Sequence, residues 1–264
     1  MLAAKYANEP DVVIEMLLRA GASVNLIGCE RRTVLHYAAS RGSAIAVLLR
    51  VGANSSIQDA EGNIALHYAA LEGNTDAVQH LVVRNKEMVN SRNRQNQTPL
   101  HFAAINGNAT TIDFLLKHNG DMRNADSHGK LPIWYSSYYG HTETVRIFIL
   151  HLSPLGYIEK DGTHIQTDNP MRAAIEKRHF EVVKLLVLAG CDSTPVLKWL
   201  HDWSLESRDL YADHVTWLER HLYEPWPLFH MCRIVVRRSM QDGRDIDSLP
   251  LPALLKQCVR MHDV

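Results

Sequence analysis

The chain has 264 residues, of which 46% are hydrophobic and 22% charged, and its formal net charge is −1. This balance is typical of a globular protein and not of a disordered chain, and the near-zero charge offers no attraction for a polyanion, so we do not expect nucleic acid as a partner. The most apolar stretches, residues 145–152 and 182–190, are far shorter than the roughly 20 residues that a spanning helix needs, so we expect no membrane contact either.

The N-terminal residues and the cysteines favour the cytosol or the nucleus. Lys5, Glu9 and Asp11 fall where a signal peptide would need an apolar run. The four cysteines are widely separated and include no Cys-x-x-Cys pair: Cys29, Cys191, Cys232 and Cys258. This spacing indicates neither a zinc site nor a disulfide framework.

One tetrapeptide recurs along the chain. Its copies are Thr33–His36, Ile64–His67, Thr98–His101, Leu131–Trp134 and Asn169–Arg172. Successive copies follow at a period of about 33 residues, with a longer last step, and such a period is typical of stacked structural repeats.

The residues around the tetrapeptide predict two helices in each repeat. Thr98 can cap a helix that starts at Pro99, where no amide donor is needed. Alanine pairs such as Ala103-Ala104 allow close helix approach. Glycines that can close the first helix in a left-handed conformation follow at Gly42, Gly73 and Gly107. A second apolar run with helical spacing comes next, for example at residues 111–116.

This pattern resembles the ankyrin repeat family over residues 1–192, which implies a solenoid of stacked helix pairs. Residues 1–4 look like the tail of a first helix without its opening hairpin. An incomplete repeat, a truncated chain and an unusual cap all fit this start, and the sequence does not separate them.

Three departures from the repeat pattern carry structural expectations. The short distance from Gly42 to Gly52 predicts a short second helix with irregular packing. Arg178 stands where a helix-closing glycine is expected. The extra residues 155–167 are rich in glycine and charge, so we expect an exposed, mobile loop there.

The C-terminal quarter of the chain has a different pattern. Apolar residues spaced through 193–223 predict helices that cap the stack. The next segment opens with Pro227 and places Leu228, Cys232 and Val236 on one helical stripe. The prolines of the sequence Leu-Pro-Leu-Pro at 249–252 fix an extended entry before a final helix.

Together, the segments within 224–264 resemble the SOCS box, and the whole chain is similar to the ankyrin repeat and SOCS box family. The resemblance implies an all-α fold, an ankyrin-repeat solenoid with a C-terminal three-helix SOCS box. It also implies a non-catalytic receptor that brings a target protein to a ubiquitin ligase made of elongin B, elongin C, cullin-5 and its RING protein. The implied elongin C contacts are Leu228, Cys232 and Val236, and the implied cullin contacts are Leu249, Pro250, Leu251 and Pro252.

Two alternatives stay open. The chain could be a plain ankyrin scaffold in which Leu228 belongs to the core of a terminal cap. The cullin could be cullin-2 in place of cullin-5.

The 15 histidines raise the question of a metal site. His36, His67 and His101 share one repeat position, so a hydrogen bond between neighbouring loops is the stronger interpretation. The sequence also has no nucleophile elbow, phosphate-binding glycine loop or metalloprotease motif. We therefore expect no enzymatic activity and no cofactor.

Ankyrin proteins usually bind partners through the hairpin tips and the exposed side of the first helices. The candidate target-binding residues on those elements are Arg31, Arg32, Glu61, Gln95, Gln97, His128, Lys130, Tyr138 and Tyr139. The neighbouring tyrosines are the preferred pair, since aromatic residues often anchor interfaces.

Overall fold

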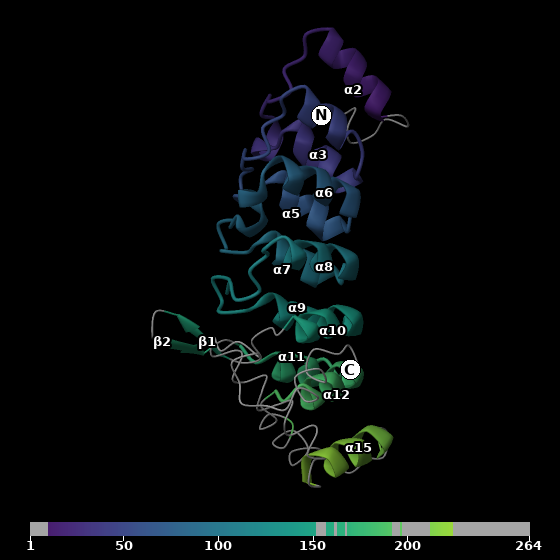
Figure 1. Cartoon of the computed structure of the whole chain (residues 1–264), viewed down its shortest axis with the longest axis vertical. Coiled ribbons are helices and arrows are strands. Elements are labelled where there is room, and N and C mark those ends of the chain that lie inside the picture. The colour runs from purple at the N-terminus through teal and green to yellow at the C-terminus, as the bar shows by residue number, and fades with distance from the viewer. Residues whose placement is uncertain are drawn as a thin grey trace, which may run out of the picture. The chain divides into compact units, whose positions relative to one another are not determined.

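The computed structural model describes residues 10–151, 157–160, 163–166, 168–191, 196 and 212–223. Short helices follow one another in pairs along most of this length (Figure 1). The first-half helices are α2 (Pro10–Arg19), α3 (Val34–Arg41), α4 (Ile45–Arg50), α5 (Ala65–Glu72), α6 (Thr75–Arg84), α7 (Pro99–Asn106) and α8 (Ala109–Lys117), with short 3-10 turns at Cys29–Arg31 and Lys86–Asn90. The later elements are α9 (Pro132–Tyr138), α10 (Thr142–Leu150), β1 (Tyr157–Lys160), β2 (Thr163–Gln166), α11 (Pro170–Glu176), α12 (Phe180–Leu188) and α15 (Ala212–Tyr223).

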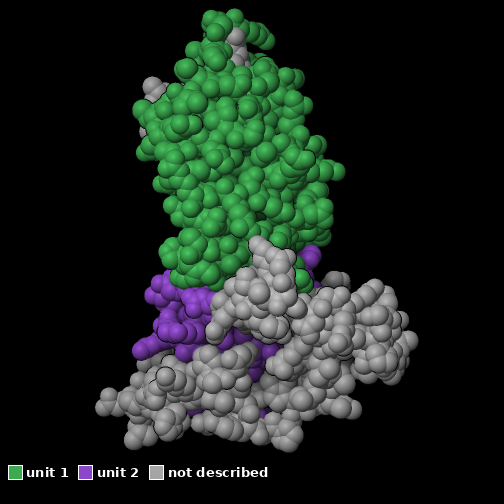
Figure 2. All heavy atoms as spheres, turned by 90° about the vertical axis from the view of Figure 1, so that its left-hand side faces the viewer, with its two compact units in different colours: residues 1–132 green, residues 133–264 purple. Residues whose placement is uncertain are grey.

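The chain divides into two compact units, Met1–Pro132 and Ile133–Val264, coloured green and purple in Figure 2. The core of the first unit is lined by small and branched apolar side chains from both helices of each pair, such as Leu35, Leu48 and Leu66. The second unit buries Phe148, Met171 and Leu186 in the same way. Every helix among the described residues is too short or too polar to span a bilayer.

Each first helix starts where the tetrapeptide predicts. Thr98 is extended, with φ −101° and ψ 166°, and Pro99 is the first residue of α7. The backbone N–H of Thr98 donates to Nδ1 of His101 at 3.1 Å. Because Nδ1 accepts, the ring carries its proton on Nε2 and can donate a second hydrogen bond from there.

The three repeated histidines link their helix pairs to the next hairpin. Nε2 of His36 lies 3.1 Å from the carbonyl oxygen of Asn63, and the matching distances are 3.1 Å from His67 to Gln97 and 3.2 Å from His101 to Lys130. Burial lowers the pKa of both His67 and His101 to about 4. The predicted hydrogen bonds between neighbouring loops are therefore confirmed.

The ends of the first helices are also as predicted. Gly42, Gly73 and Gly107 have φ values of 71°, 70° and 73°, the left-handed region that favours glycine. Arg178 adopts the same conformation, with φ 61°, at the corresponding point after α11. The next repeat adds a cap, since the side-chain amide of Asn108 donates to the carbonyls of Ala70 and Leu71 at 2.9 and 2.7 Å.

The expected short second helix is confirmed, but the expected loop is wrong. Helix α4 has 6 residues against 10 in α6, and Ala44 before it is left-handed with φ 58°. Within residues 155–167, β1 and β2 form an antiparallel hairpin in which Ile158 pairs with Ile165. The β-branched residues of the two strands and the Asp-Gly sequence between them favour a hairpin over an irregular loop.

Helix α15 confirms one of the helices expected between 193 and 223. Its ring-bearing residues contact α12, where His214 stacks on Phe180 with ring centroids 4.7 Å apart. Val215 and Leu218 of α15 are buried. The remaining helices expected in this segment, and all predicted contacts within 224–264, lie outside the described residues.

Candidate protein-binding surfaces

The tips of four successive hairpins in the first unit are joined by backbone hydrogen bonds. The N–H of Ala60 donates to the carbonyl of Glu30 at 2.8 Å, that of Arg94 to Glu61 at 3.0 Å, and that of Ser127 to Gln95 at 2.8 Å. Such a row of bonds fixes the spacing of the tips, so side chains that project from it are held in register.

Five of the nine predicted target-binding residues are exposed and four are half-buried. Arg31, Glu61, Gln95 and His128 project from the hairpin tips, and we call these four the hairpin-tip surface. Tyr139 is also exposed, at 48%. The half-buried residues are Arg32, Gln97, Lys130 and Tyr138. Whether any of the nine contacts a target stays a prediction.

Hydrogen bonds to the buried carboxylate of Asp59 hold the second hairpin. Oδ1 of Asp59 accepts the backbone N–H groups of Glu61 and Asn63, while Oδ2 accepts the hydroxyl of Tyr68 at 2.6 Å. Burial on its own would raise the pKa of Asp59, but these hydrogen bonds lower it below its usual value. Burial and the hydrogen bond to Asp59 raise the pKa of Tyr68 to about 12.

Arg32 contacts Asp59 and Tyr68 and is only partly exposed. Its guanidinium lies 3.0 Å from a carboxylate oxygen of Glu30 and 3.6 Å from Asp59, and 4.9 Å from the centre of the Tyr68 ring. With these partners its side chain is only 28% exposed. Of the two neighbouring arginines, Arg31 is therefore the one that presents an open side chain.

The first hairpin lacks the side-chain acceptor that holds the other three. Asp59, Asn93 and Asp126 each use a side-chain oxygen to accept two backbone N–H groups of their own hairpin. Gly28 takes this position in the first hairpin, where its N–H donates to the carbonyl of Arg32. Arg31 has φ 59° at the position that Gly62 and Gly129 occupy elsewhere.

An aromatic cluster lies at the end of α9 in the second unit, formed by Trp134, Tyr135, Tyr138 and Tyr139. The rings of Trp134 and Tyr138 are stacked, with centroids 4.9 Å apart and 17° between their planes. Tyr139 meets Tyr138 edge-on at 5.1 Å. Trp134 is buried, whereas the ring of Tyr139 is half exposed. The cluster therefore anchors one aromatic ring, that of Tyr139, at the surface.

A cation from the following repeat completes the cluster. The ammonium nitrogen of Lys177 lies 4.5 Å from the centre of the Tyr138 ring, within the range of a cation–π interaction. Its side-chain hydrogen bond with Tyr138 raises the pKa of Lys177. Nε2 of His179 also lies 3.1 Å from the carbonyl oxygen of Tyr138. The sequence interpretation missed Lys177, and it noted Trp134 only as part of the tetrapeptide.

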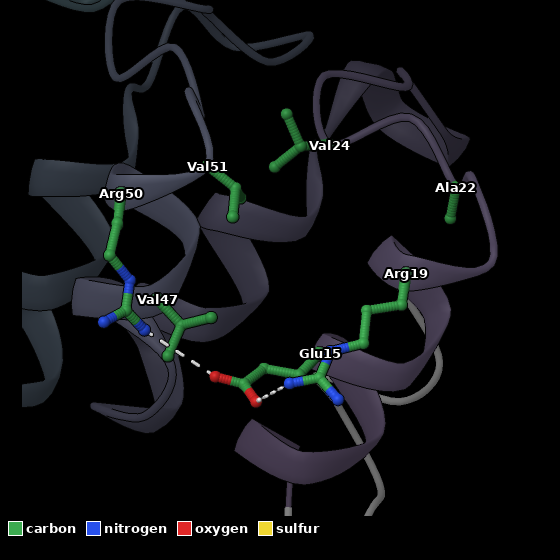
Figure 3. Close-up of a pocket in the computed structure, with 7 residues that line it drawn as sticks. All are labelled: Glu15, Arg19, Ala22, Val24, Val47, Arg50 and Val51. Atoms are coloured by element: carbon green, nitrogen blue, oxygen red, sulfur yellow. Dashed lines mark ion pairs between the residues drawn. The ribbon is translucent and has the colours of Figure 1, made fainter.

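An open hollow of about 450 Å³ lies between α2 and α4. As Figure 3 shows, Glu15 lies between Arg19 and Arg50, at 3.7 and 3.6 Å, and apolar side chains including Val24 and Val47 line the walls. Ion pairs this exposed contribute about 0–1 kcal/mol. None of the predicted target-binding residues lines this hollow.

The described residues contain no group of three or more histidine, cysteine, aspartate or glutamate side chains arranged to hold a metal ion. Among these residues, Cys29 is exposed and Cys191 is buried, and both are free thiols. The hairpin-tip surface and the aromatic cluster present projecting polar and aromatic groups, and that chemistry suits recognition of another protein.

A protein-family model described as ankyrin repeats in three copies matches residues 1–93 and 69–154. The chain belongs to the ankyrin repeat family. A second family model, the SOCS box, matches residues 224–260. Comparison with curated proteins gives no match.

The ankyrin-repeat chain thus carries a SOCS box, which confirms the resemblance drawn from the sequence. This pair of domains is that of a target-recognition adaptor of ligases built on elongin B, elongin C and a cullin. All seven predicted contacts with elongin C and the cullin fall inside the matched range: Leu228, Cys232, Val236, Leu249, Pro250, Leu251 and Pro252.

Proposed function

We propose that this protein is the non-catalytic target receptor of an elongin B/C–cullin-5 ubiquitin ligase that includes a RING protein. The observation that carries the proposal is the SOCS-box match at 224–260, which follows ankyrin repeats at 1–154. The receptor acts by proximity, since it holds a target beside the ubiquitin-conjugating enzyme and so raises the effective concentration of target lysines. It works in the cytosol or the nucleus.

The leucine-and-cysteine stripe at Leu228, Cys232 and Val236 is the proposed elongin C contact. Leu228 enters an apolar pocket, and its burial contributes about 1.5–3 kcal/mol to binding. A charge at this position would be buried without a partner and would weaken binding far more.

Co-expression with elongin B and elongin C tests this contact. The parent chain co-purifies with both, and Leu228→Asp does not. Leu26→Asp is the matched control, because Leu26 is 64% exposed on the first unit and a charge there leaves the complex intact. Equal recovery of elongins by the parent and by Leu228→Asp would remove the proposal.

The sequence Leu-Pro-Leu-Pro at 249–252 supports cullin-5 as the scaffold. Replacement of Leu249 and Pro250 by alanine should abolish recovery of cullin-5 and leave elongin binding unchanged. Recovery of cullin-2 by the parent chain, with no cullin-5, would show that the scaffold is the other cullin.

Target binding is proposed at two places, the hairpin-tip surface of the first unit and the aromatic cluster of the second. Tyr139 is the expected anchor, because its ring is open and contacts Tyr138, which is itself stacked on Trp134. An affinity capture compares the parent with Tyr139→Ala and with the control Val83→Ala, whose side chain is 73% exposed on α6. The target is lost with Tyr139→Ala alone.

A plain scaffold is the competing function, and one observation favours it. Helix α15 contacts α12 through His214 and Phe180, as a helix that caps the repeats would. The SOCS-box match begins after α15, however, and a cap made by α15 leaves the stripe at Leu228 without a purpose in a scaffold.

A further inference from the structure

The third hairpin of the first unit, residues 91–97, carries a net positive charge. It contains Arg92 and Arg94 and no acidic residue. Asn93 stands where the second hairpin has Asp59, and its Oδ1 accepts two backbone N–H groups of the same hairpin at 3.0 and 2.8 Å. Because an amide oxygen accepts these bonds as a carboxylate does, the third hairpin keeps its fold without the negative charge.

The fourth hairpin adds further positive groups. Arg123 and His128 are exposed, and Lys130 is half-buried. Asp126 is buried, and its Oδ1 accepts two backbone N–H groups of the hairpin at 2.8 and 3.0 Å. Oδ1 of the exposed Asp121 accepts the N–H of Arg123 at 2.8 Å. Both carboxylates therefore hold the backbone of this hairpin.

Contacts between the hairpins position two of these arginines. A backbone hydrogen bond of 2.8 Å joins the tips of the third and fourth hairpins. The guanidinium of Arg92 donates to the side-chain oxygen of Asn124. The stem of Arg94 lies against the tip of the second hairpin, since a Cβ atom on Gly62 would be 3.2 Å from its Cγ. The neighbouring hairpins thus limit where both side chains can lie.

Two of the guanidinium groups are open to a partner. Arg94 and Arg123 are exposed, and the described residues give neither of them a carboxylate partner. Arg32 of the first hairpin, by contrast, lies 3.0 Å from Glu30. An arginine presents its N–H groups in a planar fork that can bind a carboxylate through two hydrogen bonds. We call the following set the basic patch: Arg92, Arg94, Arg123, His128 and Lys130.

An acidic residue borders the basic patch on the side of the second hairpin. Glu61 is exposed, and its Oε2 accepts a hydrogen bond from the side-chain amide of Asn63 at 3.2 Å. The whole chain has a net charge of −1, so the positive charge is local to two hairpins. A nucleic acid carries a negative charge on every phosphate and would meet Glu61, whereas a short acidic segment of a protein can end before it.

We propose that the basic patch binds an acidic segment of the target protein, with Arg94 and Arg123 as its carboxylate-binding residues. This inference rests on the proposed receptor function, since it names the chemistry of the target that meets the hairpin tips. Opposite charges on the two partners speed their encounter and exclude partners of the wrong charge. The basic patch thereby selects targets by the charge of one segment.

Fluorescence anisotropy with the full chain tests the basic patch. The probe is a short fluorescein-labelled peptide in which glutamate and serine alternate, and the control peptide has glutamine in place of each glutamate. The glutamate peptide should bind at about 50 mM salt, and its affinity should fall at least ~5-fold at about 500 mM salt because ions screen exposed charges. The glutamine peptide should not bind.

Charge variants identify the residues that bind the peptide. The double variant Arg94→Glu, Arg123→Glu should weaken binding of the glutamate peptide at least ~10-fold. It should also gain binding of a peptide with lysine in place of glutamate, which a misfolded chain would not. Glu61→Gln should strengthen binding at least ~2-fold, since it removes a repelling charge and keeps an acceptor for Asn63. Arg84→Glu is the matched control, because Arg84 is exposed on α6, and it should leave the affinity unchanged.

The outcomes distinguish this proposal from the ligase function. Equal binding of the glutamate peptide by the parent and by the double variant overturns the basic patch, as does the absence of binding by the parent. Tighter binding of a single-stranded RNA of the same length would overturn it in favour of a nucleic acid. A parent chain that binds the glutamate peptide but not elongin B and elongin C overturns the ligase function alone.

Discussion

The ammonium group of Lys177 lies 4.5 Å from the centre of the Tyr138 ring, so a residue at the end of α11 holds one at the end of α9. Tyr138 is also stacked on Trp134, whereas Tyr139 is 48% exposed. The two adjacent tyrosines therefore have separate tasks, one structural and one available for binding.

Alanine substitutions at Tyr138 and Tyr139 should differ in their effect on stability. Tyr138→Ala removes the stacked ring and lowers the free energy of unfolding by about 1–3 kcal/mol. Tyr139→Ala changes it by less than about 0.5 kcal/mol, as is usual for exposed side chains. Urea denaturation followed by circular dichroism gives both values. Equal destabilisation by the two variants would show that Tyr139 is part of the core.

Mild acid should destabilise the repeats through His67 and His101. Their pKa is about 4 in the folded chain and about 6.5 when unfolded. Between these values the unfolded chain binds protons that the folded chain does not, so stability is complete above pH 6.5 and declines as the pH falls toward 4. Each histidine accounts for a loss on the order of 3 kcal/mol.

The measurement is the free energy of unfolding at a series of pH values from 7 to 4. The parent should lose stability steadily over this range. The double variant His67→Gln, His101→Gln is less stable at pH 7, because its links to the next hairpins are altered, but its slope below pH 6.5 is shallower. Parallel curves for the two proteins would show that other groups cause the acid loss.

Arg178→Gly should stabilise the second unit. Arg178 has φ 61°, a conformation that strains an L-residue with a Cβ atom, and glycine removes that strain at a gain of about 0.5–1 kcal/mol. Gly73→Ala makes the opposite comparison, since an added Cβ would lie 2.6 Å from Oδ1 of Asn108. Calorimetry should show a higher melting temperature for Arg178→Gly and a lower one for Gly73→Ala. A lower melting temperature for Arg178→Gly would mean that the arginine side chain outweighs its backbone strain.

Substitutions that give the first hairpin the residues found in the other hairpins should stabilise the protein. Gly28 is extended, with φ −102° and ψ −151°. The carboxylate in Gly28→Asp should accept the N–H groups of Glu30 and Arg32, the counterparts of the two that Asp59 accepts in the next hairpin. Arg31→Gly relieves a φ of 59°. Each change should raise the free energy of unfolding by about 0.5–1 kcal/mol, as measured by urea titration. If Arg31→Gly also weakens target capture, the natural sequence keeps Arg31 for binding at a cost in stability.

Local features of the fold were predictable from the sequence because their causes lie within a few residues. Thr98 and Pro99 start a helix, and Gly107 ends it, through bonds that span one turn. The role of His101 was also predictable, since a residue that recurs at the repeat period meets the same neighbour each time.

Contacts between repeats were harder to predict from the sequence. The groups that meet around Arg32, Asp59 and Tyr68 come from two repeats, and Lys177 meets Tyr138 across another pair. Nothing in the spacing of these residues distinguishes them from other surface positions. The hairpin at 157–166 was missed for a different reason, because the adjacent charges of Glu159 and Lys160 obscured the few β-branched residues of the two strands.

Titration of purified elongin B/C into the intact protein, followed by calorimetry, tests the central claim most directly. We expect saturable binding with one elongin B/C per chain, and an affinity lower by at least ~100-fold for Leu228→Asp, as follows when a charge enters an apolar pocket. The same affinity for the parent and the variant, or no binding by the parent, would contradict it.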